Sequence, residues 1–407
     1  MIKRLLIWGS ICAYVPNLSA IFPANIFELD YTKNTPPIFG KRNHQLGIFV
    51  QGMLNANGHN ELGDRVNILQ IWQPNQDSLT MLRGFDANTQ IGALADSLNT
   101  ASDDGIRGHL VPTAKMRGAK IDFTYKHALP YHLSVNMALP LFNLRLKDVS
   151  WIDLTKNITF ADQQVHNNLT NHLGQIVYDL GDKLDIVNGW EKTGLGDLLV
   201  TIDWRKMFYQ SKPILKAVTL GLAGGLSLPT GIRQNEDLLM FPPFGNDGSV
   251  GIVFSGLIEV QWWQHLHGGI NAIFLDLFGA TRNRRIKTDP NQTDLLLLAK
   301  TAARKEWGFT QQYQLYLEAF EIWKYLAART MYSYIKHNND TLYIFNQSYS
   351  SEIANTAASL REWTQHSIIF SLMYKGPLDL ELHYQHAFNG KNTIQSDLFA
   401  FSLTWNF

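Results

Sequence analysis

The stretch that decides the fold is the last one, Asp397-Leu-Phe-Ala-Phe-Ser-Leu-Thr-Trp-Asn-Phe407. Its apolar side chains recur at every second position, and the residues between them are small or polar. This period of two is that of a β-strand. A strand with aromatic residues on one face and polar residues on the other is typical of a wall between lipid and a polar interior. The alternative is an edge strand of a soluble β-sandwich.

The same stretch resembles the C-terminal signature of Gram-negative outer-membrane β-barrels, a final strand that ends in Phe. The resemblance implies that its apolar face is an assembly signal, which the barrel-assembly machinery would bind. This face consists of Phe399, Phe401, Leu403, Trp405 and Phe407.

The N-terminus has the features of a secretory signal peptide. Lys3 and Arg4 precede a short apolar run, and Leu18-Ser-Ala20 offers a small-residue cleavage site. The run is too short to span a membrane. We therefore expect residues 1–20 to be a signal peptide and residues 21–44 to be a periplasmic lead-in. The only cysteine, Cys12, lies in the signal peptide, so the mature chain would have no disulfide.

Composition favours a membrane barrel over a soluble or nucleic-acid-binding protein. Charged residues make up 17% of the chain, below the roughly 25% of soluble domains, as expected where lipid-facing positions exclude charge. The chain has 35 basic and 35 acidic residues, which predicts no nucleic acid partner. No later segment reaches the roughly 18 apolar residues of a spanning helix. No nucleotide fingerprint is present, so we expect no cofactor.

Twelve stretches show strand alternation, at 45–54, 118–126, 131–142, 195–207, 216–228, 249–262, 266–278, 307–320, 323–335, 364–374, 378–388 and 397–407. Long connections follow the odd-numbered stretches and short ones the even-numbered stretches, with a brief connection only before the last. Short periplasmic turns and long outer loops are the rule for outer-membrane barrels. The sequence thus predicts an all-β fold over residues 45–407, a transmembrane antiparallel up-and-down barrel of about twelve strands. Ten or fourteen strands remain open, and both termini would be periplasmic.

Aromatic residues near the predicted strand ends indicate two interfacial girdles. One would comprise Phe208, Trp262, Trp263 and Trp323, and the other Phe142, Trp307 and Trp363.

Two short motifs resemble a known family. Gly194-Leu-Gly-Asp197 opens the fourth predicted strand, and Leu226-Ser-Leu-Pro-Thr-Gly231 closes the fifth. Together they resemble a family of outer-membrane transporters linked to phenol meta-pathway degradation, itself related to the long-chain fatty-acid transporter type of barrel. The resemblance covers roughly residues 194–407 and implies passive uptake of small, often apolar solutes. The plainer interpretation is that both motifs only mark where the chain leaves the membrane.

Polar and charged residues occupy the predicted inward face and form the candidate site. If these residues line a water-filled lumen, they set a local electric field and an ion preference. If they instead brace a narrow, plugged barrel, they pair with opposite charges on neighbouring strands. Their mixed sign argues against strong selectivity. The set is Lys120, Asp122, Lys126, Asp203, Arg205, Glu259, Glu318, Arg329, Asp379, Glu381 and His383.

Three functions follow from these patterns. The first is a channel or transporter for small solutes; the alternatives are a surface hydrolase embedded in the barrel and a structural or adhesive barrel acting through its loops. No enzyme is expected, because the His-x-Ser-Asn-Gly stretch of outer-membrane phospholipases is absent and His383 has no serine on its strand. His265 and His267 lack further metal ligands, so no metal is expected. Outer-membrane lipid and a small-molecule solute are the expected partners.

The second long connection changes period from two to that of a helix. Its apolar stripe runs from Val165 to Leu184, and Thr159 with Asp162 resembles a capping box. So short a helix is stable only if its stripe is buried. We expect it to pack across the mouth of the barrel and narrow the pore, with the loop of residues 55–116 as its cover. A solvated helix with no gating role is the alternative.

Overall fold

The wall of the molecule consists of strands whose side chains alternate between its two faces. The computed structural model describes residues 43–99, 107–376 and 378–407. Among these residues, twelve long antiparallel strands pair in a ring, and β1 closes it by pairing with both β4 and β18. They are β1 (His44–His59), β4 (His109–Ala128), β5 (Leu133–Asp153), β7 (Leu198–Tyr209), β8 (Leu215–Leu228), β9 (Gly251–Trp262), β10 (Leu266–Leu277), β13 (Thr310–Trp323), β14 (Leu326–His337), β16 (Trp363–Tyr374), β17 (Leu378–Lys391) and β18 (Thr393–Asn406). The predicted twelve-stranded barrel is confirmed.

The two faces of each strand differ as the alternation predicts. On β8, Leu220 is 37% exposed on the outer face, whereas Thr219 is 2% exposed on the inner face. In the last strand, β18, Phe399 and Trp405 are exposed outward and Ser402 is buried inward. The predicted inward and outward faces of these two strands are therefore correct. The predicted signal peptide and nearly all of the lead-in lie outside the described residues.

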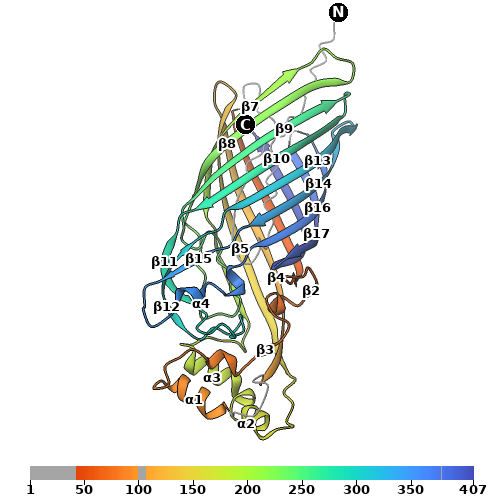
Figure 1. Cartoon of the computed structure of the whole chain (residues 1–407). Coiled ribbons are helices and arrows are strands. Elements are labelled where there is room, and N and C mark those ends of the chain that lie inside the picture. The colour runs from red at the N-terminus through yellow and green to blue at the C-terminus, as the bar shows by residue number, and fades with distance from the viewer. Residues whose placement is uncertain (1–42, 100–106, 377) are drawn as a thin grey trace, which may run out of the picture.

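Long loops and short turns lie at opposite ends of the barrel (Figure 1). The end that holds the short turns, the start of β1 and the end of β18 is called the terminus end below, and the opposite end the loop end. β4 and β5 extend toward the loop end well past their predicted limits, reaching His109 and Asp153. Most of their outward positions there are polar, Lys115, Arg117 and Lys147 among them, so the apolar signal that marked the rest of each strand is weak.

Short elements cover the loop end. β2 (Arg65–Val66), β3 (Gln76–Asp77) and β6 (Trp190–Leu195) add to the wall, and β11 (Ala280–Arg285), β12 (Lys300–Glu306) and β15 (Thr341–Ile344) form a separate sheet. The helices are α1 (Gln90–Leu98), α2 (Phe160–Asn168), α3 (Leu173–Leu180) and α4 (Ser351–Ala354), with 3₁₀ turns at Ile68–Gln70, Thr80–Leu82, Thr170–His172 and Ala358–Leu360. None of the helices in the described ranges is long and apolar enough to cross a membrane.

One of the two predicted aromatic girdles is wrong. Trp263 and Trp323 are 57% and 76% exposed at the terminus end, as an interfacial girdle requires. At the loop end, by contrast, Phe142, Trp307 and Trp363 are buried. The strands continue beyond the apolar belt at this end, so these three side chains lie inside the protein rather than at a membrane interface.

The predicted loop helix is two helices. Thr159 caps α2 as expected, with its hydroxyl oxygen 3.1 Å from the Asp162 amide nitrogen that donates to it. The helix then breaks at Leu169, where the following 3₁₀ turn carries Thr170 and Asn171, residues of low helix propensity. The apolar stripe is nevertheless continuous in the core: Val165, Leu169 and Val177 are fully buried.

Candidate functional site: the barrel interior and its loop-side cover

The inward faces of the strands place the candidate residues in the interior. Nine of the eleven are buried, and Lys126 and Asp379, near the terminus end, are half-buried. The buried ones are Lys120, Asp122, Asp203, Arg205, Glu259, Glu318, Arg329, Glu381 and His383. The structure thus brings together side chains from strands far apart in the sequence.

One polar network crosses four strands. Arg205 of β7 donates to Glu259 of β9 at 3.3 Å, and the Tyr316 hydroxyl of β13 donates to the other Glu259 oxygen at 2.5 Å. The guanidinium of Arg329 lies 5.6 Å from the centre of the Tyr316 ring and donates to Glu318 at 2.6 and 2.9 Å. Two arginines and two glutamates balance in charge, so this network holds the wall together from inside.

A second group lies on the neighbouring strands β4, β5 and β7. Asp203 accepts from Asn136 at 2.7 Å and from Thr201 at 3.0 Å. The Lys120 ammonium lies 3.3 Å from the Asp122 carboxylate. These contacts, like those of the first network, pair opposite charges or satisfy them with neutral donors. They favour the bracing interpretation of the inward charges over a field set by free charges.

His383 has a serine neighbour that its own strand did not reveal. Ser371, on the adjacent strand β16, lies 3.3 Å from His383 Nδ1, and both residues are buried. The strand of His383 itself contains no serine, as predicted. Ser371 comes from another part of the sequence, so alternation along one strand does not reveal it. The pair lies inside the barrel, however, and not at the outer rim that a surface hydrolase would need.

An aromatic cluster covers the interior on the loop side. It consists of Phe142, Trp190, Phe241 and Phe244, all buried. The Phe244 ring lies 5.4 Å from Phe142 and 5.5 Å from Phe241, which in turn lies 4.9 Å from Trp190. Lys120 sits 6.0 Å from the Phe142 ring. The loop between β8 and β9 thus folds inward over the charged interior, and we call these four residues the aromatic cover.

The two family-like motifs meet and hold that loop. One Asp197 oxygen accepts from the Gly231 amide at 2.8 Å, and the other from the Asn246 amide at 2.5 Å. Thr230 donates to the Gly196 carbonyl at 2.9 Å. A side chain at Gly245 would meet the Asp197 carboxylate at 2.3 Å, so only glycine fits there. The motifs therefore do more than mark loop boundaries: they form a latch, called the Asp197 latch below.

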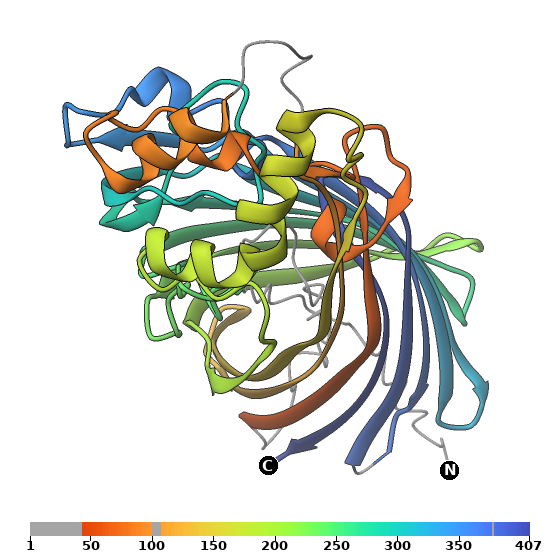
Figure 2. The same ribbon diagram turned by 90° about the horizontal axis from the view of Figure 1, so that it is seen from below.

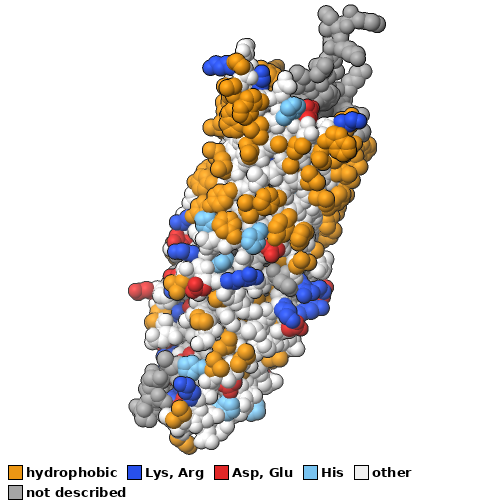
Figure 3. All heavy atoms as spheres, turned by 90° about the vertical axis from the view of Figure 1, so that its right-hand side faces the viewer, with side chains coloured by type: hydrophobic (Ala, Val, Ile, Leu, Met, Phe, Trp, Pro, Cys, Tyr) orange, Lys and Arg blue, Asp and Glu red, His pale blue; other side chains and the backbone are white. Residues whose placement is uncertain are grey.

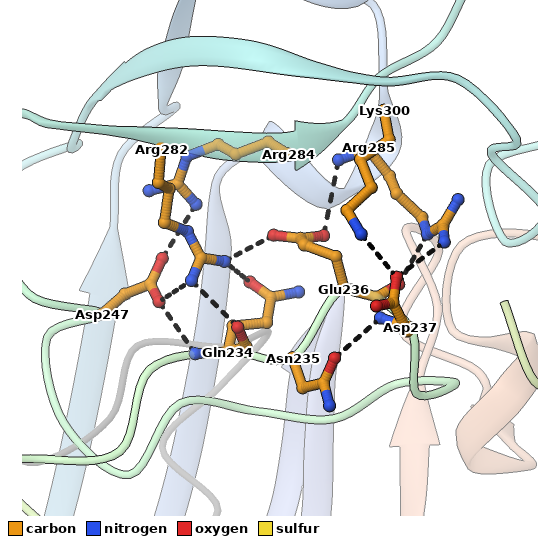
Figure 4. Close-up of polar contacts among 9 residues, drawn as sticks. All are labelled: Gln234, Asn235, Glu236, Asp237, Asp247, Arg282, Arg284, Arg285 and Lys300. Atoms are coloured by element: carbon orange, nitrogen blue, oxygen red, sulfur yellow. Dashed lines mark hydrogen bonds and ion pairs between the residues drawn. The ribbon is translucent and has the colours of Figure 1, made fainter. Parts of the chain in front are cut away.

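Charged residues fasten the same loop to β11 and β12 (Figure 4). Arg282 bridges Glu236 at 2.5 Å and Asp247 at 2.8 Å, and Arg284 also binds Asp247 at 2.8 Å. Asp237 holds both Arg285 and Lys300. Burial raises the pKa of Glu236 and lowers that of Arg284, and the opposite charges beside each group counter part of that effect.

A further ion pair lies beside this cluster. Burial opposes the charge on Asp340, yet Lys305, 2.7 Å away, and His337 hold the pKa of this carboxyl at about 2. The Lys305 ammonium also lies 3.8 Å from the Trp307 ring centre. Leu296 and Leu298, in the segment between β11 and β12, are buried in the same hydrophobic core as the aromatic cover.

The helices complete the loop end. Figure 2 looks onto this end, where α1, α2 and α3 lie over one side of the barrel. Gln164 of α2 donates to the Ser97 carbonyl of α1 at 3.1 Å, and Arg107 pairs with Asp162 at 3.1 Å. The loop of residues 55–116 thus does pack on α2 as expected. Whether the helices narrow a pore stays a prediction.

Comparisons with known proteins bear on the fold. No family model matches the chain, and no curated protein matches its sequence. Among solved structures, an outer-membrane channel from Pseudomonas putida F1 is similar over 91% of this chain and 97% of its own, with a TM-score of 0.52 and 10% identity. The toluene transporter TbuX of Ralstonia pickettii aligns over 100% of both chains with a TM-score of 0.39 and 10% identity. The first likeness shows that the chain has the fold of an outer-membrane barrel.

Proposed function

We propose that this protein is a channel in a Gram-negative outer membrane through which small solutes, hydrophobic ones included, pass passively. Its termini then lie in the periplasm and its loop end faces outward. The fold shared with an outer-membrane channel and the exposed apolar face of the strands support this location. The sequence resemblance to aromatic-solute transporters supports the solute class.

The observation that carries the proposal is the aromatic cover. Phe241 and Phe244 lie on a loop rather than on a strand of the wall. The loop is held inward by the polar contacts of the Asp197 latch and by the ion pairs that join it to β11 and β12. A cluster of aromatic rings above a polar interior is a site where an apolar solute that enters from outside can replace the contacts between the rings. A solute could thus pass when this loop moves, without any change in the barrel wall.

The test measures passage with and without the cover. Purified protein is inserted into planar bilayers for single-channel conductance and into liposomes for uptake of a labelled aromatic hydrocarbon and a labelled pentose. Phe241→Ala/Phe244→Ala should raise conductance and uptake. The control is Phe345→Ala, which removes a 59% exposed ring at the same end and should change neither.

The structural alternative has its own support in the paired interior charges. If the folded wild type and the folded Phe241→Ala/Phe244→Ala variant both conduct nothing and take up neither solute, the channel proposal is wrong. The protein is then a braced barrel that acts through its loops.

A further inference from the structure

The outer wall changes character at one level between the two ends. Hydrophobic side chains gather over the half nearer the termini, and charged side chains lie toward the loop end (Figure 3). On β4 the outward residues pass from Phe123 and Ile121 to Arg117 and Lys115. On β5, Arg145 and Lys147 lie on the outer face at the same level.

Two pairs of like charges face each other on this surface. Arg117 lies directly opposite Arg145, and Lys115 opposite Lys147. Side chains in such positions have Cβ atoms about 4.5–5.5 Å apart, and like charges there repel. Lys115 reaches Asp148 at 2.9 Å and Lys147 reaches Glu191 at 3.6 Å, but these four side chains are about half exposed or more. Exposed pairs of this kind stabilise little, so the repulsion is only partly offset.

A groove of about 570 Å³ lies beside these cations. It opens where the register of β1 shifts between Met53 and Ala56. Arg65, Lys115 and Arg117 line it on the charged side, and Leu54 and Phe399 line it toward the apolar belt. Leu54 is 60% exposed and Phe399 53% exposed. The groove therefore joins a cationic rim to a hydrophobic floor at the edge of the belt.

The groove has an excess of positive charge. Its only lining carboxylate among the described residues is Asp397, which is already held by His386 at 2.6 Å. Among the described residues, neither Arg65 nor Arg145 is in an ion pair, although Glu191 of β6 stands opposite Arg145. The charged residues that line the groove are the cations Arg65, Lys115 and Arg117 and the carboxylate Asp397. Three cations against one carboxylate leave the lining with an excess of two positive charges.

We propose that this groove binds a membrane lipid whose headgroup carries two phosphates. The phosphates lie on Arg65, Lys115, Arg117 and Arg145, and one acyl chain lies over Leu54 and Phe399. Arginine matches phosphate oxygens in a bidentate way, and two phosphates would balance the excess charge. The inference rests on the membrane location proposed above but not on transport.

The hydrophobic floor is the reason to assign a lipid rather than a soluble phosphate. A free anion would use the cations alone and would leave Leu54 and Phe399 in contact with the hydrocarbon or with water. A lipid of the loop-side leaflet places its headgroup at the level of the cations and its chains along the belt. Both parts of the groove are then filled by one molecule.

The experiment is native mass spectrometry of the detergent-purified full protein. It is titrated with lipid A carrying two phosphates, with its monophosphoryl form, and with phosphatidylethanolamine. We expect affinity to fall in that order. Arg117→Gln/Arg145→Gln should weaken binding of the two-phosphate lipid by roughly 25-fold, at about fivefold for each cation near a membrane surface. Lys212→Gln/Lys216→Gln, at the terminus end, removes the same charge elsewhere and should bind like the wild type.

Further arms decide between outcomes. Inorganic phosphate at a tenfold excess should not displace the lipid; displacement with loss of the preference among lipids would show a simple anion site and overturn the proposal. Equal binding of all three lipids, or unchanged binding by the folded Arg117→Gln/Arg145→Gln variant, would also overturn it. Arg65→Gln, in a short surface strand, provides a variant with less risk to folding and should lose about fivefold. Conductance is measured separately, so a failed channel proposal leaves the lipid result interpretable.

Discussion

Breaking the buried pair between Glu318 and Arg329 tests whether the interior charges brace the barrel. The side chains of Glu318 and Arg329 are 2% and 1% exposed, and the closest nitrogen–oxygen distance is 2.6 Å. Removing one partner leaves the other charge buried without its counter-ion, which costs about 3–5 kcal/mol. Replacing both with apolar residues removes the uncompensated charge and should cost much less. We therefore expect Glu318→Leu and Arg329→Met each to destabilise by about 3–5 kcal/mol, and the double variant by less than either.

The assay is urea unfolding of the barrel in detergent micelles or liposomes, followed by heat-modifiable mobility and tryptophan fluorescence. A double-mutant cycle isolates the pair, because the other contacts of each residue cancel. The expected coupling is several kcal/mol. Asp379→Asn, at a half-buried inward position, is the control and should cost well under 1 kcal/mol. Single variants that cost under 1 kcal/mol, with no coupling, would refute the bracing interpretation.

Three further predictions follow from the fold. Leu220→Arg places a cation on the outer face of β8 and should destabilise by roughly 2–4 kcal/mol if it lies near the bilayer midplane, whereas Leu220→Ala should cost less; equal urea midpoints for the two would contradict the register. Asp197→Ala should release the loop of the aromatic cover and raise single-channel conductance, while the exposed Asp289→Ala should not. Because the pKa of Asp340 is depressed to about 2, its ionised form adds stability that is fully present above the ordinary pKa of 3.8 and is lost as the pH falls toward about 2. The amide of Gly308 donates to Asp340. Hydrogen exchange near Gly308 should therefore become faster between these pH values in the wild type but not in Asp340→Asn.

The sequence predicted the strands because alternation is a local property. Thr219 and Leu220 already identify the two faces of β8 without knowledge of any neighbour. Where the outward residues stop being apolar, the signal disappears, and the extension of β4 beyond Arg117 was missed for that reason. In β10, Gly268 and Gly269 interrupt the alternation, so the sequence of this strand alone does not assign its two faces. The structure places His267 and Asn271 inward.

The aromatic cover could not be predicted, because its members come from separate parts of the chain. Phe241 and Phe244 lie in a loop without periodicity, and their partners Phe142 and Trp190 belong to β5 and β6. One signal was available for Phe142. It has the same parity as Asn136, which the alternation of that strand already placed inward, so its assignment to an outer girdle contradicted the strand's own pattern.

The barrel wall and the loop-side cover therefore differ in how they are stabilised. The barrel wall is set by short-range alternation, which tolerates change as long as each face keeps its polarity. The loop-side cover depends instead on individual contacts between distant residues, such as the Asp197 latch and the bridges of Arg282. These contacts belong to the loops and can be broken while the wall stays intact, whereas a strand cannot leave the wall without losing a whole ladder of hydrogen bonds. Movement that admits a solute is therefore expected in the cover, and substitutions there should alter passage while the unfolding stability of the barrel stays the same.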